Sequence, residues 1–265
     1  YGKQEIIDED IKAVVDVLKS DFLTQGPKVE EFESEFAKYV GSQYAISVSS
    51  GTAALHLSAL ALGVKKGTKI ITTPLSFVAT TNCIEYCGGE VEFCDINPDT
   101  LCLDIDLVRE KLENAPKETY AGIIPVDFAG YPVNMEEFRD LANEYNLWIL
   151  EDSCHAPGGF FIDSKKQIQK CGNGNYADLA IFSFHPVKHI ACGEGGMITT
   201  NDLDLYEKIK LLRTHGITKE KDKLAEISGG WSYEMQTLGF NYRLADIQCA
   251  LGLTQLKRAE KNLKK

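Results

Sequence analysis

Lys188 has surroundings that are unusual for a lysine in a globular protein. It belongs to the stretch SFHPVKHIACGEGGMITTND (183–202), in which its neighbours are mostly apolar and a glycine cluster follows. Burying an ammonium group is costly unless the group is paired or neutralised, so most lysines lie at the surface. A desolvated lysine loses its proton more readily and can form a Schiff base with a carbonyl group. The stretch therefore indicates a reactive lysine, with an ordinary surface lysine as the alternative.

Two further polar stretches directly follow apolar segments. SSGTAAL (49–55) combines small residues, hydroxyl groups and the start of a helical pattern, which suits a phosphate group. A helix with a serine N-cap explains this stretch equally well. EDSCHA (151–156) follows the apolar segment LWIL and contains Asp152 and His155. The aspartate has a solvated strand end as its alternative role, and a histidine in this setting is more often a satisfied core residue than a catalyst.

In combination, the three stretches favour one kind of chemistry. A phosphate cradle, a carboxylate and a desolvated lysine, in this order on an α/β chain, are the groups that pyridoxal 5′-phosphate (PLP) requires. Asp152 would pair with the pyridine nitrogen, and Lys188 would form the Schiff base and transfer protons. Phe77, in the stretch PLSF that follows another apolar segment, is the expected stacking partner of the cofactor ring.

These side chains must be positioned by short apolar strands that alternate with helices. The alternation predicts an α/β fold with a largely parallel, seven-stranded sheet that helices cover on both faces. Ligands of such sheets bind at the carboxyl ends of the strands. The predicted strands are 44–48, 69–73, 91–94, 122–126, 147–150, 179–183 and 197–200. Helical patterns include 52–62, 104–113, 134–145 and the final segment 243–265.

The composition excludes several classes of function. The chain of 265 residues carries a net charge of −11, has no basic stripe that nucleic acids would require, and has no apolar run long enough for a membrane span. An anionic ligand must therefore be held by local donors. The opening YGK shows no signal-peptide pattern, which predicts a cytoplasmic protein. Eight cysteines without a CxxC pair are expected to be reduced and mostly buried; a zinc site is the less favoured alternative, and we expect no metal.

Six stretches of the chain resemble one protein family. They are FLTQGPKVEEFE (22–33), SSGTAALHL (49–57), TTPLSFVATTN (72–82), EDSCHAPG (151–158), SFHPVKHIACGEGGMITTND (183–202) and GFNYRLADIQCALGLTQL (239–256). With these stretches in this order, the chain resembles the DegT/StrS-type sugar-nucleotide aminotransferases, of PLP fold type I, over essentially its whole length. The opening YGKQEIIDEDI and the box SFHPVKHI are most similar to members that act in pseudaminic acid biosynthesis.

The resemblance implies roles for residues around the cofactor. It implies that Lys188 is the Schiff-base lysine, that Asp152 is the partner of the pyridine nitrogen, and that His155 lies against the ring near its phenolic oxygen. The residues that it implies as phosphate ligands are Gly51, Thr52 and Ser183.

The same resemblance implies contacts that complete the site. Phe77 would stack on the cofactor ring. Asn241 would reach the phosphate in the other subunit, so the active unit would be a homodimer with shared sites. The positions that match sugar-nucleotide contacts are Tyr1, Asp21, Phe22, Leu23 and Thr24.

The implied reaction moves an amino group, with glutamate as the expected donor, to C4 of a UDP-linked 4-keto-6-deoxy-N-acetylhexosamine. The expected domain division is an N-terminal arm and helix in 1–30, a large PLP-binding α/β domain in 31–242, and in 243–265 the start of a helix that links to a smaller C-terminal domain. That smaller domain, which follows in family members, is absent from this sequence.

Other functions stay open at this stage. Another nucleotide-linked 4-keto sugar is the nearest alternative substrate. A sugar dehydratase of the same fold is less favoured, because those enzymes replace the lysine with histidine. A regulator that binds PLP or a sugar nucleotide without turnover is a second class, which the intact Lys188 and Asp152 disfavour. A nicotinamide-binding protein is disfavoured because no G-x-G-x-x-G follows a strand and opens a helix.

Overall fold

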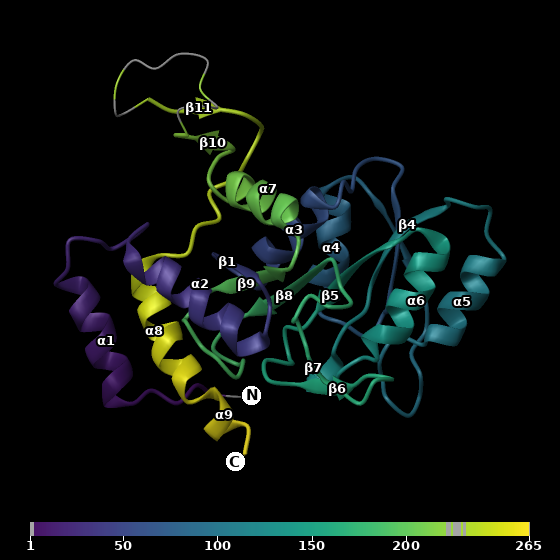
Figure 1. The fold of residues 1–265 in the computed structure, drawn as a ribbon, viewed down its shortest axis with the longest axis horizontal. Helices are drawn as coiled ribbons and strands as arrows, with labels where there is room; N and C mark the ends of the chain where they lie inside the picture. Colours follow the sequence, from purple (N-terminus) through teal and green to yellow (C-terminus); the bar gives the residue numbers. More distant parts are fainter. Residues whose placement is uncertain (1–2, 221–223, 225–228, 230–231, 265) are drawn as a thin grey trace.

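The computed structural model describes residues 3–220, 224, 229 and 232–264. Its central sheet has the strand order β1-β9-β8-β5-β4-β2-β3, and two small two-stranded sheets lie outside it (Figure 1). The central strands are β1 (Tyr44–Val48), β2 (Lys69–Thr72), β3 (Glu90–Phe93), β4 (Tyr120–Ile124), β5 (Trp148–Asp152), β8 (Leu179–Ser183) and β9 (Gly196–Thr200). The small sheets are β6 (Phe160–Ile162) with β7 (Ile168–Lys170), and β10 (Ile217–Thr218) with β11 (Glu234–Met235).

Helices cover both faces of the central sheet (Figure 1). The helices are α1 (Asp8–Leu18), α2 (Pro27–Val40), α3 (Gly51–Ala61), α4 (Ala79–Tyr86), α5 (Ile105–Glu113), α6 (Met135–Tyr145), α7 (Leu203–Arg213), α8 (Asp246–Lys257) and α9 (Ala259–Asn262). A short 3₁₀ turn spans Phe128–Gly130. Within the described part of the chain, no helix is both long and apolar enough to cross a membrane.

Six of the seven central strands run in one direction. β2 pairs in parallel with β3 and β4, β4 with β5, and β5 with β8. β9 is antiparallel to both of its neighbours, β8 and β1, so β1 points the same way as the parallel strands. The predicted fold is therefore confirmed, and the carboxyl ends of β1, β5 and β8 lie at one edge of the sheet.

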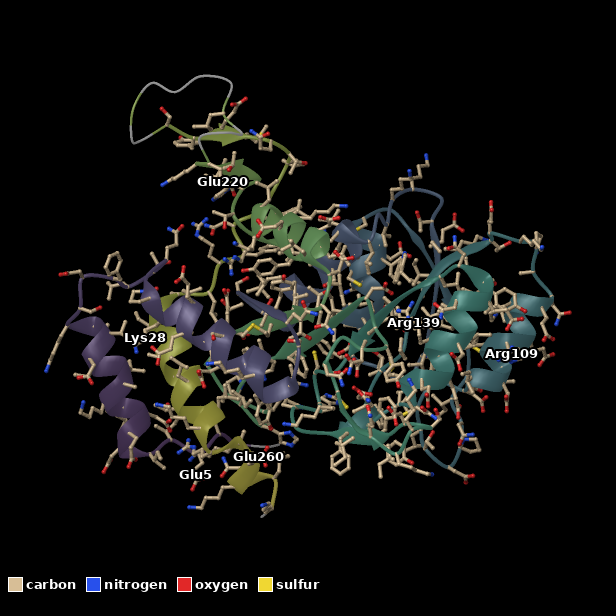
Figure 2. The ribbon with its side chains drawn as sticks, in the orientation of Figure 1. Glu5, Lys28, Arg109, Arg139, Glu220 and Glu260 are labelled. Carbon is tan, nitrogen blue, oxygen red and sulfur yellow. The ribbon has the colours of Figure 1, made fainter. Side chains whose placement is uncertain are left out.

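Successive residues of each strand face opposite sides of the sheet, and both sides are apolar. In β2, Ile70 packs into a core with α3 and α4, whereas Ile71 packs into a second core with α5 and α6. Phe182 of β8 contributes to a third core with residues of α2 and α8, where its ring meets that of Phe36 edge-on at 4.9 Å. Strands buried on both faces need continuous apolar sequence, which is why the apolar runs predicted them correctly. Side chains fill the layers between the sheet and the helices (Figure 2).

Several elements were not foreseen in the sequence. The α4 and α7 helices and the two small sheets lie in segments for which no element was predicted. The final helix also differs, because α8 begins at Asp246 rather than near Arg243 and the helical geometry breaks at Arg258 before α9. The prediction for the cysteines is confirmed, since all eight are free thiols and six of them are buried.

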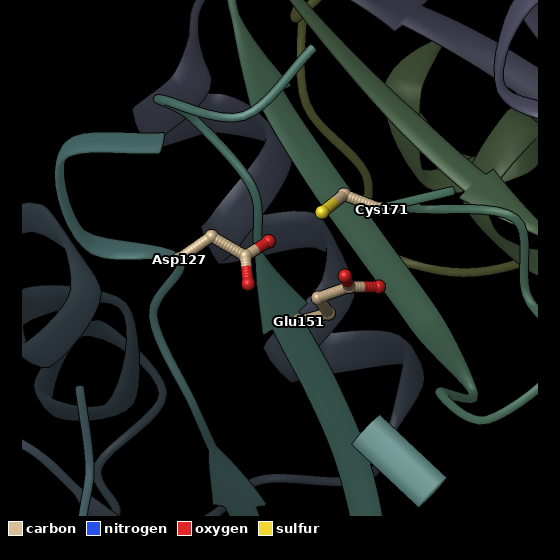
Figure 3. Close-up of side chains that lie close together, drawn as sticks. All are labelled: Asp127, Glu151 and Cys171. Carbon is tan, nitrogen blue, oxygen red and sulfur yellow. The ribbon is translucent and has the colours of Figure 1, made fainter. Parts of the chain in front are cut away.

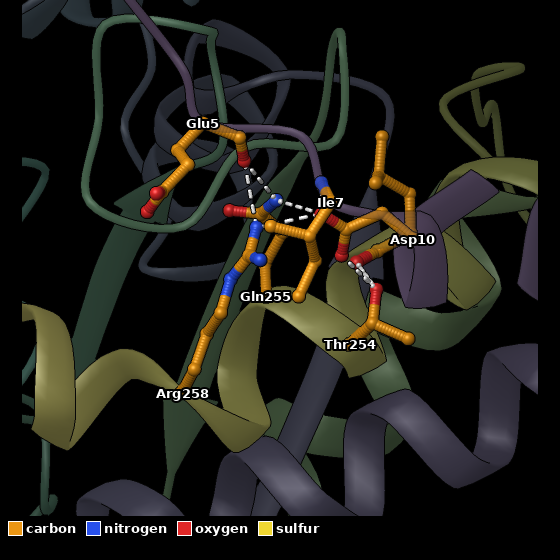
Figure 4. A network of polar contacts seen from close by, with 7 residues as sticks. Glu5, Ile7, Asp10, Thr254, Gln255 and Arg258 are labelled. Atoms are coloured by element: carbon orange, nitrogen blue, oxygen red, sulfur yellow. Dashed lines mark hydrogen bonds and ion pairs between the residues drawn. The ribbon is translucent and has the colours of Figure 1, made fainter.

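Helix α1 and helix α8 are joined by a buried carboxylate (Figure 4). Asp10 is completely inaccessible to solvent and accepts hydrogen bonds from Thr254 Oγ1 at 2.6 Å, Gln255 Nε2 at 3.1 Å and Arg258 Nη2 at 2.6 Å. The backbone N–H of Ile7 donates to the same carboxylate at 3.0 Å. These contacts bring the two ends of the described chain together. The division into segments 1–30, 31–242 and 243–265 stays a prediction.

Candidate active site

Three segments that follow strands meet around Gly51, the first residue of α3. A Cβ atom placed on Gly51 would lie 2.9 Å from Ser183 Cβ, 3.2 Å from Ser183 Oγ and 3.5 Å from Cys154 Sγ. A side chain at this position would therefore collide with the end of β8, so glycine is required. The stretches around 51, 154 and 183, which the sequence placed after three separate strands, thus form one small cradle.

The start of α3 leaves backbone donors facing this cradle. Ser50 is the N-cap, and its Oγ accepts a hydrogen bond from Ala53 N at 3.1 Å. The amide of Ala54 donates to the Ser50 carbonyl at 3.0 Å. The first amides of a helix, here Gly51 and Thr52, have no carbonyl partner within the helix and can bind an anion. The serine cap and the phosphate cradle are therefore compatible, because they use different amides.

Asp152 is the last residue of β5 and is only 3% exposed. One carboxylate oxygen, Oδ2, accepts a hydrogen bond from Thr80 Oγ1 at 2.7 Å. The other, Oδ1, accepts one from Cys154 N at 3.2 Å. Sequence analysis missed Thr80, although it lies in the stretch TTPLSFVATTN that also supplies Phe77. The buried carboxylate is thus held by two donors and keeps lone pairs for a cationic partner.

His155 follows Asp152 in the turn after β5 and is half-buried. Its Nδ1 accepts a hydrogen bond from Ala129 N at 3.3 Å, which assigns the ring proton to Nε2. Burial lowers the pKa of His155, and the positive charge of Lys188 lowers it further against the opposing effect of Asp152. The side chain is therefore a neutral donor at its Nε2 atom near pH 7.

Lys188 lies in a turn after β8, where its backbone N–H donates to the carbonyl of His185 at 2.8 Å. The lysine is half-buried, and both His185 and His189 are exposed. The expectation of a hidden lysine was wrong for this chain, because the residue lies in a surface turn and not in the apolar strand that precedes it. Its charge nevertheless acts on His155 and on Cys154, so the amine lies in the vicinity of these two residues.

Phe77 is 71% exposed in the turn before α4, so its ring is free to contact a ligand. The segment Asp21–Thr24 lies against the start of α8. There the Leu23 carbonyl accepts a hydrogen bond from Asp246 N at 3.1 Å, and Thr24 forms an isolated bridge with Ala245. Tyr1 lies outside the described residues. The roles of Phe77, Tyr1 and Asp21–Thr24 stay predictions.

Asn241 is exposed and points away from the core of its own chain. Its neighbours Phe240 and Tyr242 stack on each other with ring centroids 5.1 Å apart, and both contact the ring of His56 on α3. Because residues alternate in extended backbone, the asparagine between them faces the opposite side. On sequence alone, Asn241 could instead cap the helix that follows it; the structure excludes this role, because the N-cap of α8 is Ala245. Its role toward another subunit stays a prediction.

Asp127 and Glu151 form a buried pair of acids (Figure 3), and the backbone N–H of Asp127 donates to the carbonyl of Asp152 at 3.1 Å. One carboxylate oxygen of Asp127, one of Glu151 and the Sγ atom of Cys171 lie within 4.8 Å of one another, and all three residues are buried. Asp127 accepts hydrogen bonds from Ser153 Oγ at 2.7 Å and Val133 N at 2.9 Å, and Glu151 accepts one from Gly172 N at 3.0 Å.

The two acids do not both ionise at neutral pH. Burial raises the pKa of Asp127 to about 6, and burial together with the charge of Asp127 raises the pKa of Glu151 well above its usual value. Glu151 is therefore protonated beside an ionised Asp127, and the two carboxyl groups share one proton.

Replacing Glu151 with glutamine is expected to make stability less sensitive to pH. Since the folded-state pKa values of both acids are raised, their contribution to stability is fully present below about pH 4. The part due to Asp127 is lost as pH rises through about 6, and the part due to Glu151 is lost as pH rises through its own raised pKa. Glutamine keeps the shape of protonated glutamate without its proton. In thermal unfolding, the variant should gain about 1 kcal/mol or more over the parent between pH 5 and pH 8. The exposed change Glu144→Gln is the control, and equal pH profiles for parent and Glu151→Gln would contradict the shared proton.

The seven-stranded sheet and its flanking helices correspond to the architecture of PLP-dependent aminotransferases. The model of the DegT/DnrJ/EryC1/StrS aminotransferase family matches residues 4–265, and the chain belongs to this family.

Individual relatives and solved structures agree with the family assignment. The chain is 42% identical over 266 residues to the UDP-4-amino-4,6-dideoxy-N-acetyl-beta-L-altrosamine transaminase of Campylobacter jejuni (serotype O:23/36), covering 100% of this chain and 66% of that protein. The structure of Helicobacter pylori PseC, an aminotransferase involved in the biosynthesis of pseudoaminic acid, superposes with a TM-score of 0.85 at 36% identity, covering 98% of this chain and 66% of PseC. The structure of NtdA from Bacillus subtilis, with bound cofactor PMP, superposes with a TM-score of 0.80 at 31% identity, covering 97% of this chain and 55% of NtdA. The chain spans about two thirds of the length of the curated relatives it matches.

Proposed function

We propose that the protein is a PLP-dependent transaminase that acts on a nucleotide-linked keto sugar. The observation that supports the proposal is the close approach of Gly51, Ser183 and Cys154 beside the buried carboxylate of Asp152, with the charge of the half-buried Lys188 acting on Cys154 and His155. The expected product is UDP-4-amino-4,6-dideoxy-N-acetyl-β-L-altrosamine, an intermediate of pseudaminic acid biosynthesis. Relatives whose names carry this substrate and pathway support the choice of sugar.

The residues present fit PLP. The helix-start amides of Gly51 and Thr52, with the hydroxyl of Ser183, would hold the phosphate, since a side chain at 51 would fill the cradle. Asp152 would accept a hydrogen bond from the protonated pyridine nitrogen, and the neutral His155 would donate from Nε2 to the phenolic oxygen. Once bound, the cofactor supplies an electron sink for the carbon atom that loses its proton.

Lys188 carries out the proton transfers in this proposal. In the first half-reaction its Nζ removes the proton from the α-carbon of glutamate, and in the second it delivers a proton to C4 of the sugar. The neighbouring Asp152 stays ionised and stabilises the positive ring nitrogen throughout. We include a cytoplasmic location in the proposal, in keeping with eight free thiols.

The experiment that tests this function uses full-length protein with glutamate and candidate UDP-linked 4-keto-6-deoxy sugars. We expect amination at C4 of the N-acetylated substrate, with the configuration of the product determined by NMR and Lys188→Ala protein as the inactive control. If the protein turns over another keto sugar preferentially, the proposed substrate is wrong but the proposed transamination stands. Tight binding of cofactor and sugar without any product would instead support a non-catalytic regulator.

A mixing experiment tests the predicted homodimer with shared sites. The exposed Asn241 is expected to bind the phosphate held by the partner subunit, across a two-fold interface. Heterodimers of Lys188→Ala and Asn241→Ala subunits should then regain activity, because one of the two sites receives both an intact lysine and an intact asparagine. If each asparagine serves its own chain, both sites stay damaged and mixing gives no gain over the parents. Thr81→Val protein mixed with Lys188→Ala protein serves as the control for subunit exchange.

A further inference from the structure

We infer that Thr80, supported by Ser76, is a positioning residue that holds the Asp152 carboxylate in the orientation that a protonated ring nitrogen requires. The inference rests on the proposed function, because it assigns Asp152 to that nitrogen. Thr80 is completely buried at the start of α4, and its Oγ1 lies 2.7 Å from Asp152 Oδ2. It comes from a helix 72 positions earlier in the chain, so the contact depends on the tertiary fold.

The direction of each hydrogen bond follows from the proton count. An ionised carboxylate can only accept, so the hydroxyl proton of Thr80 must be directed at Asp152. The oxygen of Thr80 is then free to accept from Ser76 Oγ, which lies 2.6 Å away. Ser76 Oγ also lies 2.9 Å from the Phe77 carbonyl, so its single proton is shared between two acceptors. Thr80 is consequently the donor on which Oδ2 depends.

Two donors fix the carboxylate plane from opposite ends. Thr80 Oγ1 holds Oδ2, and Cys154 N holds Oδ1 at 3.2 Å. A carboxylate that loses one of these donors can rotate about its Cβ–Cγ bond, and the remaining lone pairs no longer point in one direction. The turn that carries Thr80 also carries Phe77, the expected stacking residue. The orientation of the carboxylate and the position of the aromatic ring are thus set by a single element, the beginning of α4.

The test compares binding of PLP with binding of 1-deaza-PLP, in which carbon replaces the ring nitrogen. Both molecules keep the phosphate and the aldehyde, so they differ only in the group that Asp152 recognises. The variants are Thr80→Val, which keeps the shape of the side chain but removes the donor, and Thr80→Ser, which restores the donor. Thr81→Val is the matched control, because Thr81 lies on the same helix and its hydroxyl donates to the Val78 carbonyl at 2.8 Å. Equilibrium dialysis of full-length apo-protein gives the dissociation constants without any turnover.

We expect Thr80→Val to weaken PLP binding about tenfold, the loss typical of a hydrogen bond to a charged group. Binding of 1-deaza-PLP should change less than about twofold, because the ring offers Asp152 no proton. Thr80→Ser should restore the affinity for PLP, and Thr81→Val should leave both affinities as in the parent.

Three results would overturn the inference. If Thr80→Val weakens the binding of PLP and of 1-deaza-PLP equally, Thr80 only shapes the pocket. An unchanged preference for PLP in that variant would mean that Asp152 keeps its orientation without Thr80. If the parent protein itself binds the two ligands equally, Asp152 does not pair with the ring nitrogen, and the proposed function fails together with the inference. The first two results leave the proposed function standing.

Discussion

Replacing Lys188 with alanine is expected to lower kcat by at least ~10³-fold in full-length protein. The side chain has two functions in the proposed reaction, as the amine that binds the cofactor aldehyde and as the base that moves the proton, and each is worth orders of magnitude. Steady-state amination of the keto sugar by glutamate measures the effect. The exposed lysine change Lys117→Ala should leave the rate unchanged.

Chemical trapping checks the same residue independently of turnover. Borohydride should reduce the bond between cofactor and lysine, so that peptide mapping finds the label on Lys188 of the yellow parent protein. The Lys188→Ala variant should not be labelled. A label on another lysine, or unchanged turnover of the alanine variant, would remove Lys188 from the mechanism.

Replacing Asp152 with asparagine is expected to lower kcat by about 10²-fold or more, the loss typical of a missing preorganised charge. The amide keeps the size of the carboxylate, and its oxygen can still accept from Thr80 at the buried end of β5. It cannot neutralise a protonated ring nitrogen, so the negative charge that develops at the substrate carbon is stabilised less. The measurement is kcat at saturating glutamate and sugar.

The control for Asp152→Asn is Asp99→Asn, which changes an exposed carboxylate in a loop. Normal kcat in the control together with a large loss at position 152 would locate the effect in the site. Near-normal turnover of Asp152→Asn would place this aspartate outside the reaction.

Most strands of the central sheet could be predicted because each is a short apolar run between polar residues; the edge strand β3 alternates glutamates with apolar residues instead. A strand that is buried on both faces has no alternative to such a run, and the first polar residues after it must lie at its carboxyl end. This is why the stretches that contain Gly51 and Asp152 were identified from their positions after strands, whereas Ser183 was named only through the family resemblance. The same reasoning failed for Lys188, because apolar neighbours in sequence do not bury a residue that lies in a turn.

The contacts that support the site could not be read from local patterns. Thr80 donates to Asp152 from a helix far away in sequence, and a threonine near a helix start has many ordinary roles. Asp127 and Glu151 are 24 positions apart and meet only because the chain after β4 continues alongside β5, where Val126 pairs with Asp152. Tertiary pairing decides such contacts, so the structure was needed to find them.

The carboxylate of Asp10 constrains the order in which the chain can fold. Its partners Thr254, Gln255 and Arg258 lie 244 to 248 positions later in the sequence. While the protein is being synthesised, a docked α1 would bury this charge without its three side-chain donors, which is strongly unfavourable. Contacts that close so long a loop also form slowly. Helix α1 therefore stays solvated until α8 has left the ribosome, because the residues that bury and satisfy its carboxylate come from that end of the chain.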